Sequence, residues 1–493
     1  MVESEPIRIK VTETPEATGA YNWLKIRGKE MFAKSGLVRE GKVLCSDMDL
    51  VRRLFKEAAA ELNPSVWGQY WEHVILAPAL GRRIAEASKN KLKIDPNSIE
   101  LALWFHDLGI MVTPQYNRKD KVGDRLLQEI GVSKLIELLS STHKLMVAAE
   151  GLGLTKEQIS LKADLTPEQM AKVEKYFQGL TPAQRITNLA DNMGKIDENG
   201  GLFTMAAFKK YLATQETRYD QTSKWPSVDW AIRSEDGKFP RRPLGAVLQY
   251  FTIKRTIEWL NDQGVNFEEI CQSLTNYGPR FVALIRHGEV DNPTGKVYTR
   301  DYLMATEDIP HLNNQGQQQM QEAANLLSKR KFRVKKIYKS PEARAQESAE
   351  CIAKILGIQE IRESYLLDDA FAPGPYLKGT RMETFLEGGG NVWDPRWAEY
   401  HHETPEAIKR RMQGIFRQAT SGLKAGETGV LVSHGDPIAF LLRDLEEKTV
   451  GPENIDQNQA SYPKKGEAKM VVIDPEGLLF AIYSLNGPQL MKA

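Results

Sequence analysis

The sequence predicts a multidomain protein in which an all-α block is followed by an α/β block. Its 493 residues exceed what one hydrophobic core of ordinary size accommodates, so two or three domains are expected. Apolar residues recur at helical spacing in the first half of the chain, whereas short β-rich runs alternate with helical stretches after residue 279. The predicted segments are a lead-in (1–60), an all-α domain (61–200), a helical connector (201–278) and an α/β domain (279–493).

The composition excludes several classes of function. Lys and Arg number 66 against 65 Asp and Glu, so the net charge of +1 gives no electrostatic footprint for nucleic acid. No segment approaches the run of about 18 apolar residues that spans a bilayer. The N-terminus lacks the features of a secretory signal, and the three cysteines are widely spaced. We therefore expect a cytoplasmic protein without a disulfide framework.

The helical prediction rests on apolar periodicity. After the possible cap Ser46, a helix is expected from Asp47 through Glu61. Spacings of three and four between apolar residues follow in WEHVILAPALGRRIAEA, IELALWFHDLG and VGDRLLQEIGVSKLIELLSSTHKLM. The connector passes through a polar stretch and recovers helical periodicity in LGAVLQYFTIKRTIEWL.

The α/β prediction rests on a change of period after Gly278 and Pro279. RFVALIRHG, VKKIYKS, GVLVSHG and AKMVVID are short β-rich runs, and most are separated by helical stretches such as PEARAQESAECIAKIL. Strands alternating with helices imply a mostly parallel sheet that is covered on both faces. In such sheets the chemistry gathers at the carboxyl ends of the strands.

Three polar clusters fall where these strands should end: RHGE at 286–289, SPEAR at 340–344 and SHGD at 433–436. A phosphoryl group needs cations on its oxygens, a nucleophile in line with the leaving oxygen, and an acid that protonates that oxygen. Arginine binds two phosphate oxygens with one planar fork. Gly288 is expected to let the backbone approach the anion. The clusters therefore indicate phosphoryl transfer.

The motifs LIRHGE, LNNQGQQQ, YKSPEARAQESAE and VLVSHGDP occur together and in this order. With them, residues 279–493 resemble the histidine phosphatase superfamily, which includes the cofactor-dependent phosphoglycerate mutases. The resemblance implies a three-layer α/β fold and phosphomonoester hydrolysis through a phosphohistidine, without a cofactor. It assigns His287 as the nucleophile, and Arg286, Arg344 and His434 as phosphate ligands.

Three aspartates are candidates for the proton donor. Family members often place a glutamate beyond the SPxxRA arginine, where this sequence reads SYLLDDAFAPG. The resemblance therefore favours Asp369 and, after it, Asp368. Asp436 is the rival, although it could instead cap the helix that starts at Pro437.

A second constellation lies in the all-α block, where His106 and Asp107 are adjacent within the apolar sequence ALWFHDLG. His73 precedes them on another predicted helix, and Asp191 closes the periodic segment AQRITNLADNMGK. Imidazole plus carboxylate suits a divalent transition metal such as Mn²⁺, Fe²⁺, Co²⁺ or Zn²⁺. Neighbouring residues of a helix point about 100° apart, so His106 and Asp107 can share one ion only if it lies close against that helix.

The order His, His-Asp, Asp on successive helices resembles the HD superfamily of metal-dependent phosphohydrolases, over roughly residues 65–200. The resemblance implies that His73, His106, Asp107 and Asp191 bind one divalent metal. Asp124 stands about where two-metal members carry a further histidine, which favours a single metal here. His143 could bind substrate phosphate or be a core histidine, and the domain could also be a helical scaffold with a vestigial site.

Together these features predict a two-domain phosphohydrolase that acts on a small phosphorylated metabolite or a nucleotide, with a phosphatase site and a second, metal-dependent site. Two alternatives remain. The first is a phosphomutase, which returns the phosphate to another hydroxyl instead of water. The second is a nucleotide-sensing regulator whose HD domain binds a ligand without turning it over. Neither a membrane nor nucleic acid is expected as a partner.

Overall fold

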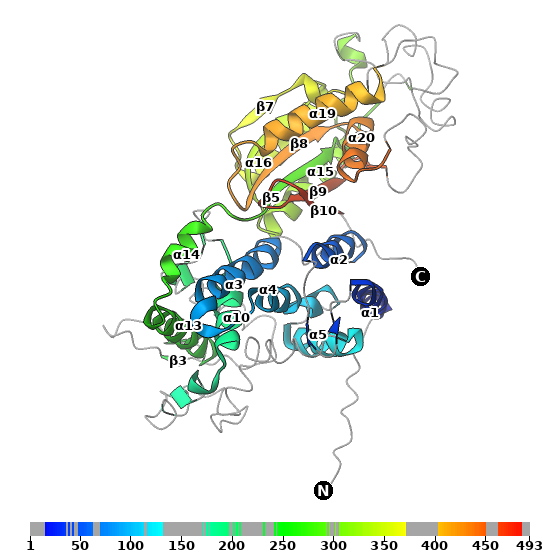
Figure 1. The fold of residues 1–493 in the computed structure, drawn as a ribbon. Coiled ribbons are helices and arrows are strands. Elements are labelled where there is room, and N and C mark those ends of the chain that lie inside the picture. Colours follow the sequence, from blue (N-terminus) through cyan, green and yellow to red (C-terminus); the bar gives the residue numbers. More distant parts are fainter. Residues whose placement is uncertain are drawn as a thin grey trace. The chain divides into compact units, whose positions relative to one another are not determined.

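In the computed structural model, helices dominate up to Tyr277 and a mixed α/β arrangement follows from Gly278, which divides the chain into two compact units (Figure 1). None of the helices that the structure describes is long and apolar enough to cross a membrane. The structure describes residues 15–35, 38–39, 42–43, 48–62, 70–112, 116–131, 171, 174–175, 177–196, 201–202, 204–205, 207–208, 230–231, 241–242, 244–292, 295, 301, 305–370, 403–449 and 462–485.

The first unit is helical, as predicted, with two short two-stranded ribbons. The helix expected from Asp47 begins at Met48. The elements are α1 (Pro15–Ser35), β1 (Val38–Arg39), β2 (Lys42–Val43), α2 (Met48–Glu61), α3 (Tyr70–Leu92), α4 (Pro96–Phe105), η2 (Leu108–Met111), α5 (Tyr116–Ile130), α10 (Pro182–Met193), β3 (Trp230–Ala231), β4 (Arg241–Arg242), α13 (Leu244–Asp262) and α14 (Phe267–Ser273).

Side-chain caps define the starts of the two helices that carry the His-Asp cluster. The Asp95 carboxylate accepts hydrogen bonds from the backbone of Asn97 and Ser98 at the start of α4. At α10, Thr181 and Gln184 form a reciprocal capping box. These caps fix where α4 and α10 begin.

One apolar core joins α3, α4 and α10, and the helices that follow residue 201 contribute to it as well. Leu80 and Leu103 pack with Leu189, while Ile253 and Leu260 of α13 belong to the same cluster. All five side chains are fully buried. The second half of the predicted connector is thus part of the core of the first unit.

The second unit holds a six-stranded sheet in the order β10-β9-β5-β8-β6-β7. Strands β5, β8, β6 and β7 are parallel, as expected. At one edge of the sheet, β9 pairs antiparallel with β5, and β10 pairs antiparallel with β9. The strands are β5 (Arg280–Arg286), β6 (Arg333–Lys339), β7 (Ile361–Glu363), β8 (Glu427–Ser433), β9 (Ala468–Ile473) and β10 (Leu479–Ser484).

Helices cover the sheet, in the pairs α15 with α16 and α19 with α20 (Figure 1). Leu284 of β5 and Leu431 of β8 share a core with Met412 and Phe440 of the second pair. Consecutive residues of β5 and β8 are buried, as expected when both faces of a sheet are covered. The helices are α15 (Asn314–Lys329), α16 (Ala343–Leu356), α19 (Pro405–Thr420) and α20 (Gly435–Leu445).

The register of the parallel strands brings the predicted polar clusters to one edge. Arg286 at the end of β5 is paired with Ser433 at the end of β8, and Lys339 of β6 is paired with Val432. The segments that follow these strands therefore start side by side. A short 3-10 helix, η5 (Tyr365–Leu367), follows β7 and leads into Asp368.

Candidate active site and metal centre

His287 is held rigidly directly after β5. Its backbone N–H donates to the Ser433 carbonyl at 3.0 Å, and its own carbonyl accepts from the Gly466 N–H at 3.1 Å. The ring is buried, and Nδ1 lies 2.8 Å from the carbonyl oxygen of Gly288. A carbonyl can only accept, so Nδ1 carries the proton and Nε2 keeps its lone pair.

The surroundings of His287 also keep the imidazole neutral. Burial is the main cause that lowers its pKa well below the usual value, and the positive charges of Arg344, His434 and Arg286 lower it further. A neutral imidazole with a lone pair on Nε2 is the form that can attack phosphorus.

Two arginines bring positive charge to this site. Arg344, in the first turn of α16, is 1% exposed, and its Nη2 lies 3.3 Å from Asp369 Oδ2. Arg286 donates to the Pro463 carbonyl at 2.9 Å, and its guanidinium lies over the Tyr462 ring at 5.2 Å from the centroid.

His434, the N-cap residue of α20, is the last member of this group. Its ring centroid lies 5.2 Å from that of His287. Its Nε2 is 3.0 Å from Ser340 Oγ, and its Nδ1 is 3.5 Å from Asp369 Oδ2. The structure thus brings His287, His434, the two arginines and Asp369 together, although they come from four separate stretches of sequence.

The three candidate acids differ in environment. Asp369 contacts both Arg344 and His434, and its side chain is 40% exposed. Asp368 is buried and accepts a hydrogen bond from Ser340 Oγ at 3.1 Å. Asp436 is also buried, and its pKa is raised to about 7, by burial first and then by the charge of Asp369.

Gly288 allows another group to approach its backbone closely, but that group is the protein backbone and not the expected anion. A Cβ on Gly288 would collide with the backbone of Gly316 at the start of α15, and one on Gly316 would collide with the backbone of Glu289. The Gly288 N–H also lies 3.2 Å from Ser348 Oγ, which in turn donates to the Arg344 carbonyl. The RHGE segment is thereby tied to both α15 and α16.

A sequence profile of the histidine phosphatase superfamily (branch 1) matches residues 282–464, the part of the chain that carries this cluster. Residues 282–464 form a histidine phosphatase domain. No curated protein matches the chain.

Solved structures of similar fold include three phosphatases. The mycobacterial glucosyl-3-phosphoglycerate phosphatase is 18% identical, covers 42% of this chain and 96% of its own, and has a TM-score of 0.31. The alpha-ribazole phosphatase from Shigella flexneri is 19% identical, with coverages of 43% and 98% and a TM-score of 0.33. A phosphoserine phosphatase mutant from Entamoeba histolytica is 20% identical, with coverages of 42% and 98% and a TM-score of 0.31.

Sequence reasoning missed several residues around the histidine phosphatase site. Tyr462 supports Arg286 and binds Asp436, and Ser340 lies between His434 and Asp368. Ser340 belongs to the SPEAR motif, which could have drawn attention to it. Tyr462 carries no such signal because it stands alone, far from the motifs it contacts.

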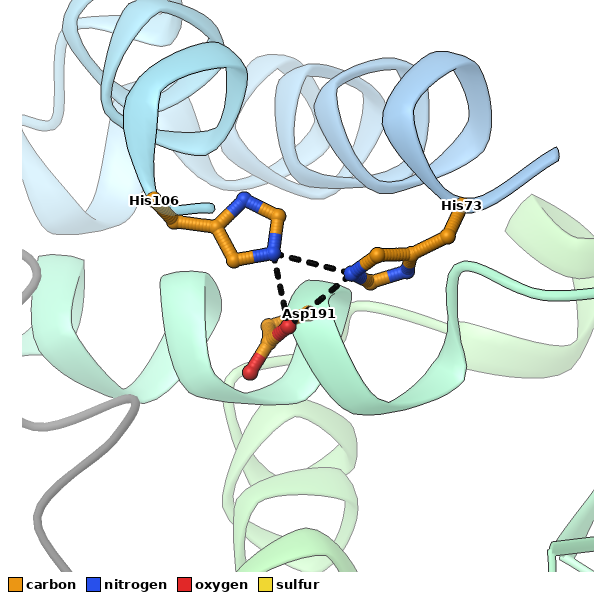
Figure 2. Close-up of side chains that lie close together, drawn as sticks. All are labelled: His73, His106 and Asp191. Atoms are coloured by element: carbon orange, nitrogen blue, oxygen red, sulfur yellow. Dashed lines mark hydrogen bonds and ion pairs between the residues drawn. The ribbon is translucent and has the colours of Figure 1, made fainter. Parts of the chain in front are cut away.

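The second predicted cluster forms within the helical unit. Figure 2 shows His73 of α3, His106 at the end of α4 and Asp191 in the last turn of α10 turned toward one another. The two Nε2 atoms are 2.8 Å apart, and Asp191 Oδ1 lies 2.9 Å from His106 Nε2 and 3.2 Å from His73 Nε2. Asp107 Oδ2 is 3.3 Å from His106 Nε2 and 3.6 Å from His73 Nε2.

Asp107 reaches the cluster because α4 ends before it. Helix α4 stops at Phe105, so His106 is its C-cap and Asp107 lies in the following turn. The expectation that both residues sit on one helix, about 100° apart, does not hold. The turn allows both side chains to approach the same point.

The tautomers of the two histidines follow from their backbone contacts. His73 Nδ1 lies 3.2 Å from the Gly194 carbonyl, and His106 Nδ1 lies 2.5 Å from the Leu103 carbonyl. Each Nδ1 therefore donates, which turns each Nε2 toward the other ring and toward the carboxylates. These converging acceptor atoms need a cation among them, either a proton on His106 or a metal ion.

The pKa shifts agree with this requirement. Burial lowers the pKa of His73. Burial opposes a charge on His106 as well, but the carboxylates of Asp107 and Asp191 raise its pKa to about 10. The residues fit a divalent transition metal, which prefers imidazole nitrogen and carboxylate oxygen.

The remaining candidates of the helical block lie outside this cluster. Within the described ranges, the possible ligands that all lie within 4.8 Å of one another are those of His73, His106 and Asp191. Neither Asp107 nor Asp124 of α5 is in that group, although Asp107 contacts both histidines. His143 lies outside the described residues.

Proposed function

We propose that the histidine phosphatase domain hydrolyses a phosphomonoester through a phosphohistidine at His287. The observation that carries this proposal is the bond between His287 Nδ1 and the Gly288 carbonyl, which leaves Nε2 as the nucleophile of a buried, neutral ring. Nε2 attacks phosphorus, and the bond between phosphorus and the leaving oxygen breaks. Arg286, Arg344 and His434 stabilise the charge on the remaining phosphate oxygens.

Asp369 is the proposed proton donor. It contacts Arg344 and His434 and is the most exposed of the three candidate acids, so it can reach a leaving oxygen that points to solvent. After its proton has gone to the leaving alcohol, the carboxylate takes a proton from water. That water attacks the phosphohistidine, and His287 is regenerated together with inorganic phosphate.

A rapid-quench experiment with labelled phosphomonoester tests this function. We expect an acid-labile phosphoenzyme, its loss in His287→Ala, and a fall in turnover by several orders of magnitude. His311→Ala, an exposed histidine of the same domain, is the control and should behave as wild type. Release of inorganic phosphate distinguishes hydrolysis from a mutase, which would yield an isomeric phosphoester instead. Wild-type rates in His287→Ala would overturn the proposal.

We further propose that the helical unit is an HD-type, metal-dependent phosphohydrolase with His73, His106, Asp107 and Asp191 as ligands. The converging Nε2 lone pairs of the two histidines favour this second function. A bound divalent metal would supply Lewis-acid chemistry for hydrolysis. The protein contributes the orientation of the rings, which the carbonyls of Gly194 and Leu103 maintain.

Metal content and nucleotide turnover test the second function separately. Wild-type protein loaded with Mn²⁺, Fe²⁺, Co²⁺ or Zn²⁺ should retain one ion per chain after desalting, and Asp191→Asn should retain much less. Incubation with a nucleotide panel should release products only in the loaded wild type. Nucleotide that binds to the loaded protein and survives would favour the regulator instead, and equal metal content in wild type and Asp191→Asn would exclude the site.

A further inference from the structure

Two carboxyl groups that no part of the proposed mechanism uses lie beside Arg344. Glu342 precedes α16 as its N-cap residue and is 4% exposed, and Asp301 is far away in sequence. Asp301 Oδ1 and Glu342 Oε2 each lie 3.6 Å from Nη1 of Arg344. Asp369 contacts the other terminal nitrogen, Nη2. The guanidinium is thus held from two sides.

Reciprocal backbone contacts hold the two carboxyls in place. The N–H of Asp301 donates to Glu342 Oε2 at 2.9 Å, and the N–H of Ala343 donates to Asp301 Oδ2 at 2.5 Å. Each carboxyl is therefore bound to the chain segment of the other. Since both also approach the same nitrogen of Arg344, the two groups face each other across a small space.

Charge balance makes this arrangement unusual. Two ionised carboxylates here and Asp369 opposite would place three negative charges around one buried guanidinium. Burial and hydrogen bonding to Asp301 raise the pKa of Glu342 to about 8, against the opposing effect of Arg344. Glu342 therefore holds its proton at neutral pH and adds no negative charge beside Nη1. Asp369 lies against the opposite terminal nitrogen of Arg344, and Arg344 itself lies close enough to His287 to lower the pKa of that ring.

We propose that Asp301 and Glu342 are positioning residues that hold the guanidinium of Arg344 and set the positive charge that it offers to phosphate. The inference rests on the proposed role of Arg344 as a phosphate ligand. With the proton present, Arg344 keeps most of its attraction for the substrate dianion. With the proton lost, a second negative charge beside Nη1 weakens that attraction, so KM rises while kcat changes little.

The test is the pH profile of p-nitrophenyl phosphate hydrolysis by the full chain between pH 6 and 9.5. Glu342→Gln keeps the shape and neutrality of the protonated acid and cannot ionise. The ratio of wild-type to variant KM should be near unity at pH 7 and rise about tenfold by pH 9.5, with a flat kcat ratio. Taking the ratio cancels the ionisation of the substrate and of every other group in the site.

Asp301→Asn is the second variant, because it also removes one charge from the pair and should flatten the rise in KM. It keeps the test valid if Glu342→Gln does not fold. Glu350→Gln is the matched control, since Glu350 lies on the same helix but is exposed and bound to Lys339. The control should follow the wild-type profile.

Two outcomes are decisive against the inference: a wild-type rise in KM that persists in both variants, or losses of kcat that are equal at every pH, as expected of residues that merely support the fold. His287→Ala is assayed in parallel. If that variant retains activity, the proposed function itself fails, whereas loss of its activity with unaltered profiles in the other variants refutes only the role of the carboxyl pair.

Discussion

The hydroxyl of Tyr462 donates a 2.6 Å hydrogen bond to the buried carboxyl of Asp436. The same ring lies beneath the guanidinium of Arg286, so one side chain joins this proposed phosphate ligand to the SHGD segment.

The first prediction separates these two contacts of Tyr462. Tyr462→Phe keeps the aromatic face under Arg286 and should leave KM for p-nitrophenyl phosphate within about twofold of wild type. Tyr462→Ala removes the face and should raise KM about tenfold, because Arg286 loses its support. Steady-state kinetics measure both values. An equal rise in the two variants would mean that the hydroxyl, and not the ring, supports the site.

The second prediction concerns the acid. Asp369→Ala should lower kcat/KM for an alkyl phosphate about 100-fold or more, because an alkoxide leaves poorly without a proton. The loss on p-nitrophenyl phosphate should be far smaller, since its leaving group needs little protonation. Asp436→Ala measured on the same two substrates is the comparison. Should only Asp436→Ala discriminate between the substrates, the roles of the two aspartates must be exchanged.

The third prediction links Asp436 to stability. The fold raises its pKa from 3.8 to about 7, so between these values the folded state binds a proton that the unfolded state has lost. Its contribution to stability is complete below about pH 4 and is lost as pH rises toward 7. Asp436→Asn, which stays neutral, should lose less stability than wild type between pH 4.5 and 7.5, as measured by thermal unfolding. Parallel melting curves would contradict the raised pKa.

The fourth prediction is that the two proposed reactions are independent. Chelation should remove only the metal-dependent hydrolysis, because the arginines neutralise the phosphate at the His287 site without a metal. His106→Ala should lose its bound metal but keep hydrolysis of p-nitrophenyl phosphate within about threefold. Metal analysis and both assays on one preparation give the answer. A chelator that silenced both reactions would indicate one shared site.

A fragment starting at Asn276 extends this prediction. It holds enough residues for its own core and should fold and retain the His287 reaction. Circular dichroism and the phosphatase assay check this together. A folded but inactive fragment would show that the first unit contributes to catalysis.

The sequence was most informative where motif and strand coincide. The runs ending in RHGE and SHGD could be placed at one sheet edge because parallel strands share the direction of their carboxyl ends, and Arg286 is indeed paired with Ser433. The His-Asp cluster could be predicted from residue type and order. Its geometry could not, because α4 ends at Phe105 without a Gly or Pro that would mark the end.

Other features of the structure could not be predicted because no local sequence pattern marks them. AKMVVID is buried along its length, as a parallel strand would be, so its antiparallel pairing with β5 had no signal in the pattern. Periodicity predicted a helix within 244–262 but not its partner, and Ile253 packs into the core of the first unit. Asp301 and Tyr462 are single residues whose roles depend on chain segments far from them.

The contact between Gly288 and Gly316 limits how the loop around His287 can change during evolution. In most protein cores, a larger side chain can be accommodated when a second substitution makes the neighbouring side chain smaller. Here the neighbour at each position is main chain, of Gly316 in one case and Glu289 in the other. Main-chain atoms cannot be made smaller by substitution, so no second substitution at the point of collision can compensate for replacing either glycine. A library that varies the loop around His287 should therefore return glycine at both positions among its active members.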